Sequence, residues 1–155
     1  MESPLVIELA KHPNIRGMKD SSGDVKLISE TVWNTNPRSF SVVAGRGATL
    51  LHTMVAGARG GIIALVCASP KAMVRLYRAY ILGDLRKADD LQRIIAPAAN
   101  AVTSKYGISG LKYAMEIEGF QPGIARRPLL PTTPAQQQDL QQIFRRMNSE
   151  ISELS

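Results

Sequence analysis

At 155 residues and 45% apolar content, the chain has the size of one domain with a real hydrophobic core, which excludes a disordered tail. Its single cysteine, Cys67, excludes an internal disulfide, and no cysteine or histidine spacing typical of a metal site occurs. The net charge of +6 comes from basic residues spread along the chain, and no apolar stretch is long enough for a membrane span. We therefore expect no metal, nucleic acid or membrane partner, and a cytoplasmic location.

The first half of the chain alternates apolar runs with helical patterns. The runs expected as strands are residues 15–20, 40–45 and 61–66. Ser3 followed by Pro4 predicts the N-cap of a helix ending near residue 12, and Asp24 predicts the cap of the next. Gly47 opens a third helix. Strands separated by helices are typical of repeated βαβ units in a parallel sheet, so this half is predicted as α/β.

From Pro70 onward the strand pattern disappears. Helices are expected up to Gly83, from Asp84, over 109–118 and from Thr133 onward. Thr133 is followed by Pro134 and, three residues after the threonine, by Gln136, which predicts a capping box. The second half is therefore predicted to be helical, with one long loop before its last helix.

Lys19 stands at the end of the first predicted strand, inside "NIRGMKDSSGD". Period-two geometry places Ile15, Gly17 and Lys19 on one face and Lys19 at the carboxyl end, where α/β folds bind their ligands. Apolar surroundings disfavour the ammonium form of a lysine, and a neutral amine attacks a carbonyl to give a Schiff base. The alternative is a lysine whose side chain extends from a strand end into solvent.

Four motifs carry a family resemblance: "GMKDSSGD", "VVAGRG", "GARGGIIALV" and "KYGISGLKYAMEIEGFQPGIARRPL". In this order they resemble the C-terminal half of the dihydrodipicolinate synthase / N-acetylneuraminate lyase family, class I aldolases built on a (β/α)8 barrel with a small helical domain. Within the family, the residues of "GMKDSSGD" and "YGISGLKYAMEIEGF" are most similar to the 4-hydroxy-2-oxoglutarate aldolase branch. The resemblance implies that residues 1–82 form about the last three βα units of a TIM barrel and that residues 83–155 form a C-terminal helical domain.

The resemblance also implies roles for individual residues. Lys19 matches the Schiff-base lysine that binds pyruvate or another 2-oxo acid, so the lysine imine takes the place of a cofactor. Ser21 and Ser22 match the loop that shapes the substrate site. Gly45 matches a glycine that lets a substrate approach the backbone, with simple turn geometry as its alternative. Ile63 matches a residue whose backbone carbonyl lies near the lysine, with a core position as its alternative.

Several family features are absent from this sequence. The Thr-Thr pair of a "GTTGE" loop and the tyrosine of a "YYxxP" strand belong to the family's N-terminal half, and neither motif occurs here. A complete barrel takes ~250 residues. "GRG" at 45–47 departs from the commoner family pattern, which leaves the substrate open. We expect weak or no activity unless a complementing N-terminal half, or a homo-oligomer, completes the barrel; a mitochondrial location stays open because that half is missing.

Two other interpretations compete with an aldolase. "GRGATL" follows a predicted strand and opens a helix, as in dinucleotide-binding folds, but Leu50 stands at the third glycine position. A truncated, non-catalytic fragment or an interaction module would keep the fold without the chemistry, because fold does not determine function.

Overall fold

The computed structural model describes residues 1–154, and the chain divides into two compact units, Met1–Ile63 and the residues from Ala64 onward. The boundary inferred from the resemblance lies later, after residue 82. The helix over Pro70–Ile81 packs against the helix that follows it, so its contacts group it with the second unit. Each unit is described by itself.

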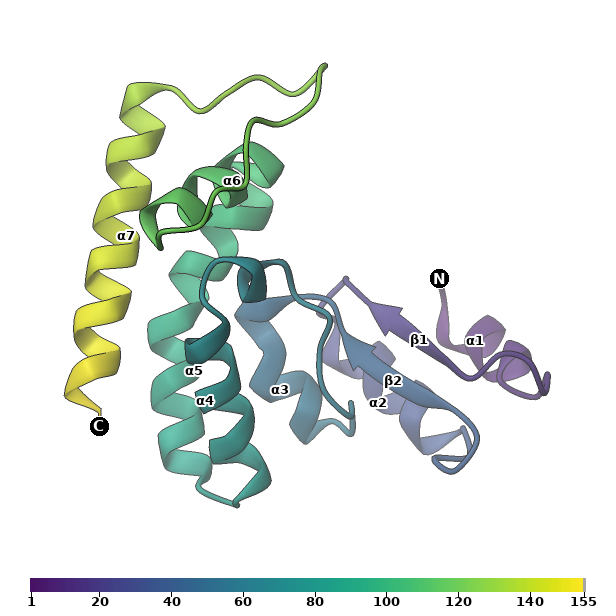
Figure 1. Ribbon diagram of the computed structural model, residues 1–155. Helices are drawn as coiled ribbons and strands as arrows, with labels where there is room; N and C mark the ends of the chain where they lie inside the picture. The colour runs from purple at the N-terminus through teal and green to yellow at the C-terminus, as the bar shows by residue number, and fades with distance from the viewer. Residues whose placement is uncertain (155) are drawn as a thin grey trace. The chain divides into compact units, whose positions relative to one another are not determined.

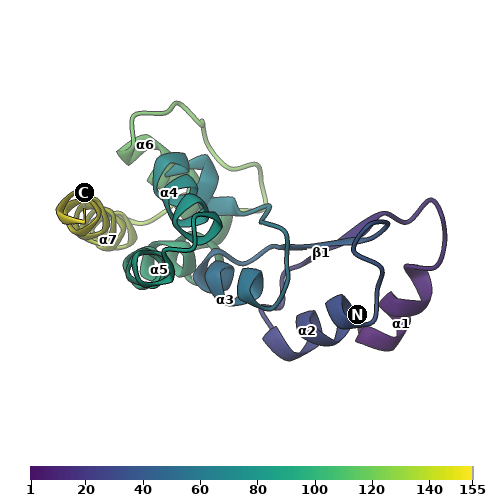
Figure 2. The same cartoon turned by 90° about the horizontal axis from the view of Figure 1, so that it is seen from below.

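The first unit contains a two-stranded parallel sheet with helices. Strand β1 (Gly17–Asp20) pairs with β2 (Ser41–Ala44), residue 17 opposite 41 and residue 20 opposite 44. The helical segments are α1 (Ser3–Leu9), α2 (Val25–Trp33), the 3-10 turn η1 (Gly47–Thr49) and α3 (Leu50–Val55). Helices α1 and α2 lie on the same side of the strands (Figure 2). The α/β class predicted for this half is confirmed.

The core of the first unit lies on the helical side of the sheet. Its buried residues come from α1, α2, the residue just before β2, β2 itself and the segment after α3: Val6, Ile28, Phe40, Val42 and Ala58. Along β2, Val42 and Ala44 are buried, whereas Ser41 and Val43 are only half-buried. Period-two alternation therefore sends one set of side chains into the core and leaves the other set on the opposite face.

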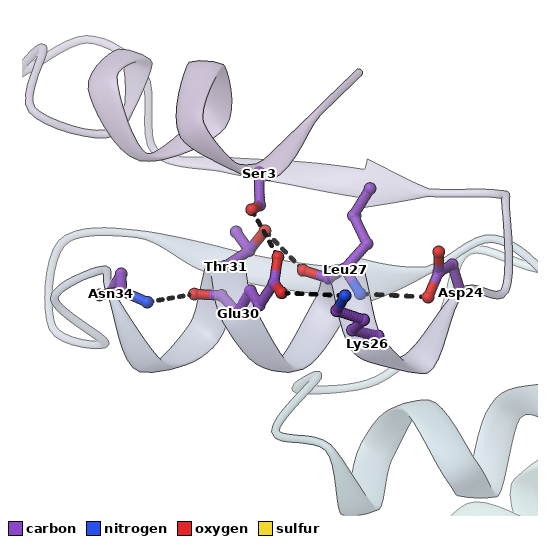
Figure 3. A network of polar contacts seen from close by, with 7 residues as sticks. All are labelled: Ser3, Asp24, Lys26, Leu27, Glu30, Thr31 and Asn34. Carbon is purple, nitrogen blue, oxygen red and sulfur yellow. Dashed lines mark hydrogen bonds and ion pairs between the residues drawn. The ribbon is translucent and has the colours of Figure 1, made fainter.

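Helix α1 is tied to α2 by a polar contact rather than capped by its own serine. Glu2 is the N-cap of α1, and Ser3 lies in the first turn, where its hydroxyl donates to Glu30 at 2.9 Å (Figure 3). The prediction of Ser3 as N-cap is therefore wrong, and α1 ends at Leu9, earlier than expected. Asp24 does cap α2, since its carboxylate accepts the Leu27 N–H at 3.1 Å.

The third predicted strand, 61–66, is reduced to a single bridge. Backbone bonds continue beyond β2 through Arg59 and Ile62, and Gly61 forms an isolated parallel bridge with Ala44. Residues Ala64–Cys67 then form a 3-10 turn, η2. Leu65, within this turn, is fully buried. The second half of the apolar run thus buries its leucine in a 3-10 turn, so the prediction of a strand over 61–66 is wrong.

The second unit is helical, as predicted. Its helices are α4 (Pro70–Ile81), α5 (Leu85–Asn100), the π-helical η3 (Ala101–Lys105), α6 (Gly107–Ile117) and α7 (Pro134–Glu153). Helix α5 packs against both α4 and α7, and the three run side by side (Figure 1). The core consists of fully buried side chains from these helices: Leu76, Leu91, Ile95, Leu140, Phe144 and Met147.

The helix starts predicted from the capping residues Asp84 and Thr133 are confirmed, whereas the helix predicted over 109–118 begins earlier, as Gly107–Ile117. The Asp84 carboxylate accepts the Lys87 N–H at 3.0 Å and caps α5. At α7, the Thr133 hydroxyl accepts the Gln136 N–H at 3.3 Å while the Gln136 side chain accepts the Thr133 N–H at 2.9 Å. This reciprocal pair satisfies two donors that a helix start leaves without intrahelical partners.

Candidate functional site around Lys19

Lys19 lies on the face of the sheet that the helices leave uncovered. It is the third residue of β1, opposite Val43, while its neighbours Met18 and Asp20 point toward the helical side. Its side chain is exposed. The period-two prediction therefore gives the position of Lys19 near the carboxyl end of β1, but this chain does not surround it with apolar walls.

Gly45 lies directly beside Lys19, just beyond the end of β2. A Cβ at position 45 would come within 2.7 Å of Lys19 Cε and would overlap Ser21 Oγ. The Gly45 N–H donates to the Asp20 carbonyl oxygen at 2.5 Å, which holds the two strand ends together. Because a side chain here would collide with these atoms, glycine lets Lys19 and Ser21 lie against the end of β2.

The loop after β1 is organised by a buried carboxylate. Asp20 accepts the Ser22 hydroxyl at 2.8 Å and the Gly23 N–H at 3.0 Å. Ser22 Oγ in turn accepts the Asp24 N–H at 3.0 Å. The hydroxyl of Ser22 therefore shapes the loop, while that of exposed Ser21 lies against Gly45.

Sequence reasoning missed Asp20 and Arg46 as parts of this site. Arg46 donates to the Ser22 carbonyl oxygen at 3.3 Å, and its Cδ lies close to Gly23. Gly23 has a φ of 72°, which favours glycine, and a Cβ there would meet the arginine. An aspartate three residues before a glycine is a recognisable signal for the loop, because its side chain can bond the following backbone. No sequence pattern predicts the bond from Arg46 to the Ser22 carbonyl oxygen.

Ile63 is a buried residue of the first unit. Its side chain packs close to Gly61, near which Leu50 also lies. The structure thus brings Lys19, Ser21 and Gly45 together, gives Ser22 a role in the loop, and places the side chain of Ile63 in the core.

The clearest electrostatic cluster lies in the second unit. Lys105 and Tyr106 both donate to Asp139, each at 3.0 Å. The bond from Lys105, and to a smaller extent the bond from Tyr106, lower the pKa of Asp139 below its ordinary value. The bond to Asp139 in turn raises the pKa of Lys105. Tyr113, the other tyrosine near α7, accepts a bond from Gln141 at 2.7 Å. All these contacts join η3 or α6 to α7, so the cluster has a structural use.

Within residues 1–154, no group of three or more histidine, cysteine or acidic side chains is arranged to hold a metal ion. None of the helices in that range combines the length and the apolar character that crossing a membrane requires.

Comparison with known proteins places these features in a family. The model of the dihydrodipicolinate synthetase family matches residues 1–147. The 4-hydroxy-tetrahydrodipicolinate synthase of Methanoculleus marisnigri is 34% identical over 144 residues, which cover 93% of this chain and 50% of that protein. The synthase of the same name from an Exiguobacterium species is 32% identical over 124 residues, covering 80% of this chain and 42% of its own length.

Solved structures agree with these matches. The 4-hydroxy-tetrahydrodipicolinate synthase of Methylacidiphilum fumariolicum superposes with a TM-score of 0.88 at 25% identity, covering 98% of this chain and 51% of that one. The dihydrodipicolinate synthase of Acinetobacter baumannii, solved with pyruvate bound, gives 0.86 at 26% identity, covering 95% of this chain and 50% of that one. The chain spans about half the length of the relatives it matches.

Proposed function

The chain belongs to the dihydrodipicolinate synthetase family, and we propose that it is the C-terminal half of a Schiff-base aldolase or lyase in which Lys19 bonds covalently to pyruvate or another 2-oxo acid. In this proposal, residues 1–82 belong to a (β/α)8 barrel whose other strands come from elsewhere. Ser21, Ser22 and Gly45 shape the substrate site beside the lysine, and the backbone of Ile63 lies on its border.

The observation that supports this proposal is the close approach of Lys19 and Ser21 to Gly45. A Cβ at position 45 would meet both Lys19 Cε and Ser21 Oγ, so glycine is what lets these two side chains lie against the end of β2. Lys19 lies on the uncovered face of the sheet and is exposed there. The buried Asp20, through its bonds to Ser22 and Gly23, holds the adjoining loop in place.

The chemistry needs only the lysine as its covalent group. The neutral Nζ attacks the 2-oxo carbon, the oxygen leaves as water, and an imine forms between Lys19 and the acid. The iminium is an electron sink, so the adjacent carbon can lose a proton to give an enamine that attacks an aldehyde, or the reverse cleavage can occur. The carboxylate of the acid requires a cation or hydrogen-bond donors, and Arg46, on the loop beyond Gly45, brings a guanidinium to this end of the sheet.

The proposal includes a second polypeptide that covers the open face. Parallel sheets are normally covered on both faces, and an unpaired strand edge readily accepts another strand. Here β1 pairs only with β2 among the described strands, and Gly17 and Lys19 are exposed. A complementing N-terminal half fits this arrangement, and a second copy of the chain is the alternative occupant.

The choice of substrate is proposed in two steps. Pyruvate comes first, because the Acinetobacter baumannii relative binds it. The second substrate, an aldehyde, would distinguish two candidate activities. Relatives of this chain are 4-hydroxy-tetrahydrodipicolinate synthases, whereas the residues of its motifs are most similar to those of 4-hydroxy-2-oxoglutarate aldolases. Assaying cleavage of 4-hydroxy-2-oxoglutarate against formation of 4-hydroxy-tetrahydrodipicolinate separates them.

Trapping with borohydride tests the imine. The chain is mixed with the N-terminal half of the Methanoculleus marisnigri relative, incubated with pyruvate, reduced and digested for peptide mass spectrometry. We expect the peptide containing Lys19 to gain the mass of pyruvic acid less one oxygen atom, because reduction converts the imine to a secondary amine. Label spread evenly over exposed lysines would contradict a specific site.

Two lysine variants provide matched controls. Lys19→Arg keeps the positive charge but removes the nucleophilic amine, so the label should disappear. Lys26→Arg changes another exposed lysine, on α2, and should leave the label on Lys19 unchanged. If Lys19 remains unlabelled with every complementing half that restores a folded complex, the non-catalytic fragment becomes the better interpretation.

A further inference from the structure

Helix α4, which packs against α5 in the helical unit, leaves an apolar face exposed (Figure 1). Val74, Tyr77 and Ile81 follow one another at intervals of three and four residues, so they lie on one face of the helix. All three are exposed, Ile81 to 60%. The other face is buried within the unit through Ala72, Met73, Leu76 and Ala79. Helix α4 is therefore apolar on two faces, and this chain covers one of them.

Exposed apolar side chains continue past the end of α4. Leu82, directly after the helix, is 82% exposed, and Leu85, the first residue of α5, is exposed as well. We call Val74, Tyr77, Ile81, Leu82 and Leu85 together the α4 surface. Soluble proteins rarely expose a concentration of large apolar side chains unless another molecule binds there. The α4 surface is therefore a candidate interaction surface, and it lies wholly within the helical unit.

The charges beside this surface oppose self-association. Lys71 stands three residues before Val74 and Arg78 four residues after it, so both cations flank the apolar face. Both are exposed, and neither forms an ion pair with a described residue. Helix α4 contains no acidic residue. A second copy that packed its own α4 here would bring like charges together, which costs free energy. The charges therefore favour a different polypeptide.

The solved relatives indicate which polypeptide this is. The Methylacidiphilum fumariolicum synthase superposes on 98% of this chain with 51% of its own length. The backbone of this chain thus occurs there within a chain about twice as long. The rest of that chain is polypeptide available to cover apolar faces that the matching half leaves exposed, because burial of apolar surface is the main favourable term in folding.

We propose that the α4 surface docks the complementing N-terminal half, through an apolar patch of that half bordered by acidic side chains. Val74, Tyr77 and Ile81 become buried in the complex, while Lys71 and Arg78 at the edge pair with the acidic groups. The inference rests on the proposed function for the identity of the partner, which was argued there from the uncovered sheet of the first unit alone. Docking is therefore measured without substrate, so that failure of the imine chemistry leaves its result unaffected.

Sedimentation velocity of the complex tests the docking. The chain is co-expressed with the N-terminal half of the Methanoculleus marisnigri relative, and the dissociation constant is obtained from a dilution series without pyruvate. The double variant Val74→Gln, Ile81→Gln should raise this constant at least tenfold, because two apolar side chains lose their burial in the complex. Equal constants for the double variant and the unmutated chain would overturn the proposal, and so would the absence of any complex.

Two controls separate docking from loss of fold and from general loss of apolar surface. The double variant alone should unfold at nearly the same temperature as the unmutated chain, because both of its side chains are exposed. Ile108→Gln changes an equally exposed apolar residue on α6 and should leave the dissociation constant unchanged.

Hydroxyl-radical footprinting gives a second measurement on the same complex. Oxidation of Tyr77 should fall several-fold when the N-terminal half is bound, whereas oxidation of Ile124, an exposed residue of the same unit, should not change. If the chain alone instead forms dimers that the double variant abolishes, the α4 surface belongs to a second copy and the proposal is overturned.

Discussion

The two compact units of this chain differ in how they bury apolar surface. In the helical unit, large side chains such as Phe144 and Leu91 are fully enclosed by several helices. In the first unit, helices cover one face of β1 and β2, and Lys19 is exposed on the other. The helical unit thus has a closed core, whereas the sheet of the first unit is covered on one face only, and the candidate catalytic lysine lies on its uncovered face. In this chain, the unit with the more complete core is not the unit that contains the candidate site.

Truncating the closed core should have the largest effect. Phe144→Ala removes a fully buried aromatic ring and should lower the free energy of unfolding by about 3–5 kcal/mol, measured by urea denaturation with circular dichroism. Ile124→Ala, at a side chain that is 83% exposed, is the control and should change stability by less than ~0.5 kcal/mol. A small effect at Phe144 would contradict the closed core.

Adding a side chain at Gly45 should have the next largest effect. In Gly45→Ala the new methyl group overlaps Ser21 Oγ and crowds Lys19 Cε, so we expect a loss of about 1–3 kcal/mol and loss of the pyruvate label. Gly83→Ala is the contrast, since open space surrounds that position and its φ of 79° alone opposes alanine, at a cost of about 1 kcal/mol. A fully labelled Gly45→Ala protein would show that glycine is not needed beside Lys19.

The helix caps should have moderate and local effects. Asp24→Ala removes the carboxylate that accepts the Leu27 N–H, and Thr133→Ala removes the hydroxyl that accepts the Gln136 N–H. Each should cost about 1 kcal/mol. Hydrogen exchange should show faster opening of α2 in the first variant and of α7 in the second. Faster exchange at β1 in Thr133→Ala would contradict a local effect.

The smallest effect should come from the Asp139 cluster. The bond from Lys105 lowers the pKa of Asp139 in the folded protein below the unfolded value of about 3.9, so its stabilising contribution is present above pH 4 and is lost as the pH falls through the folded value. Both side chains are more than a third exposed, so Asp139→Asn should cost less than ~1 kcal/mol at pH 7. The difference from the unmutated chain should shrink toward pH 2 and in 1 M salt, and a difference independent of pH would contradict this assignment.

The sequence predicts the fold best where local chemistry determines it. The capping residues Asp24, Asp84 and Thr133 mark helix starts because each satisfies backbone donors within three residues. Ser3 misleads because its hydroxyl bonds Glu30, far along the chain, instead of its own helix. The run over 61–66 misleads because strand formation depends on tertiary pairing, and only the bridge at Gly61 forms. None of the capping or periodicity patterns described above predicts the π-helical segment after α5.

The site is predictable only in part, for a related reason. Alternation along β1 gives the face and the strand end of Lys19 from the sequence alone. The proximity of Gly45 and Ser21 to that lysine is a contact between segments more than twenty residues apart, so it required either the family resemblance or the structure. The role of Asp20 in the loop is predictable from the sequence, because an aspartate before a turn can accept the following backbone N–H groups. The bond from Arg46 to Ser22 is not, because it depends on the tertiary contact between two loops.

The most direct test of the central claim is the yield of pyruvate label on Lys19 after borohydride reduction, compared between the chain alone and the chain with a complementing N-terminal half. In the chain alone Lys19 is exposed, and no second polypeptide encloses a substrate site around it. We therefore expect little label on the chain alone. Adding the complementing half should increase the label several-fold, on this lysine only. Equal labelling with and without the complementing half, accompanied by aldol turnover of the chain alone, would contradict the claim that this chain is an open half of a Schiff-base enzyme.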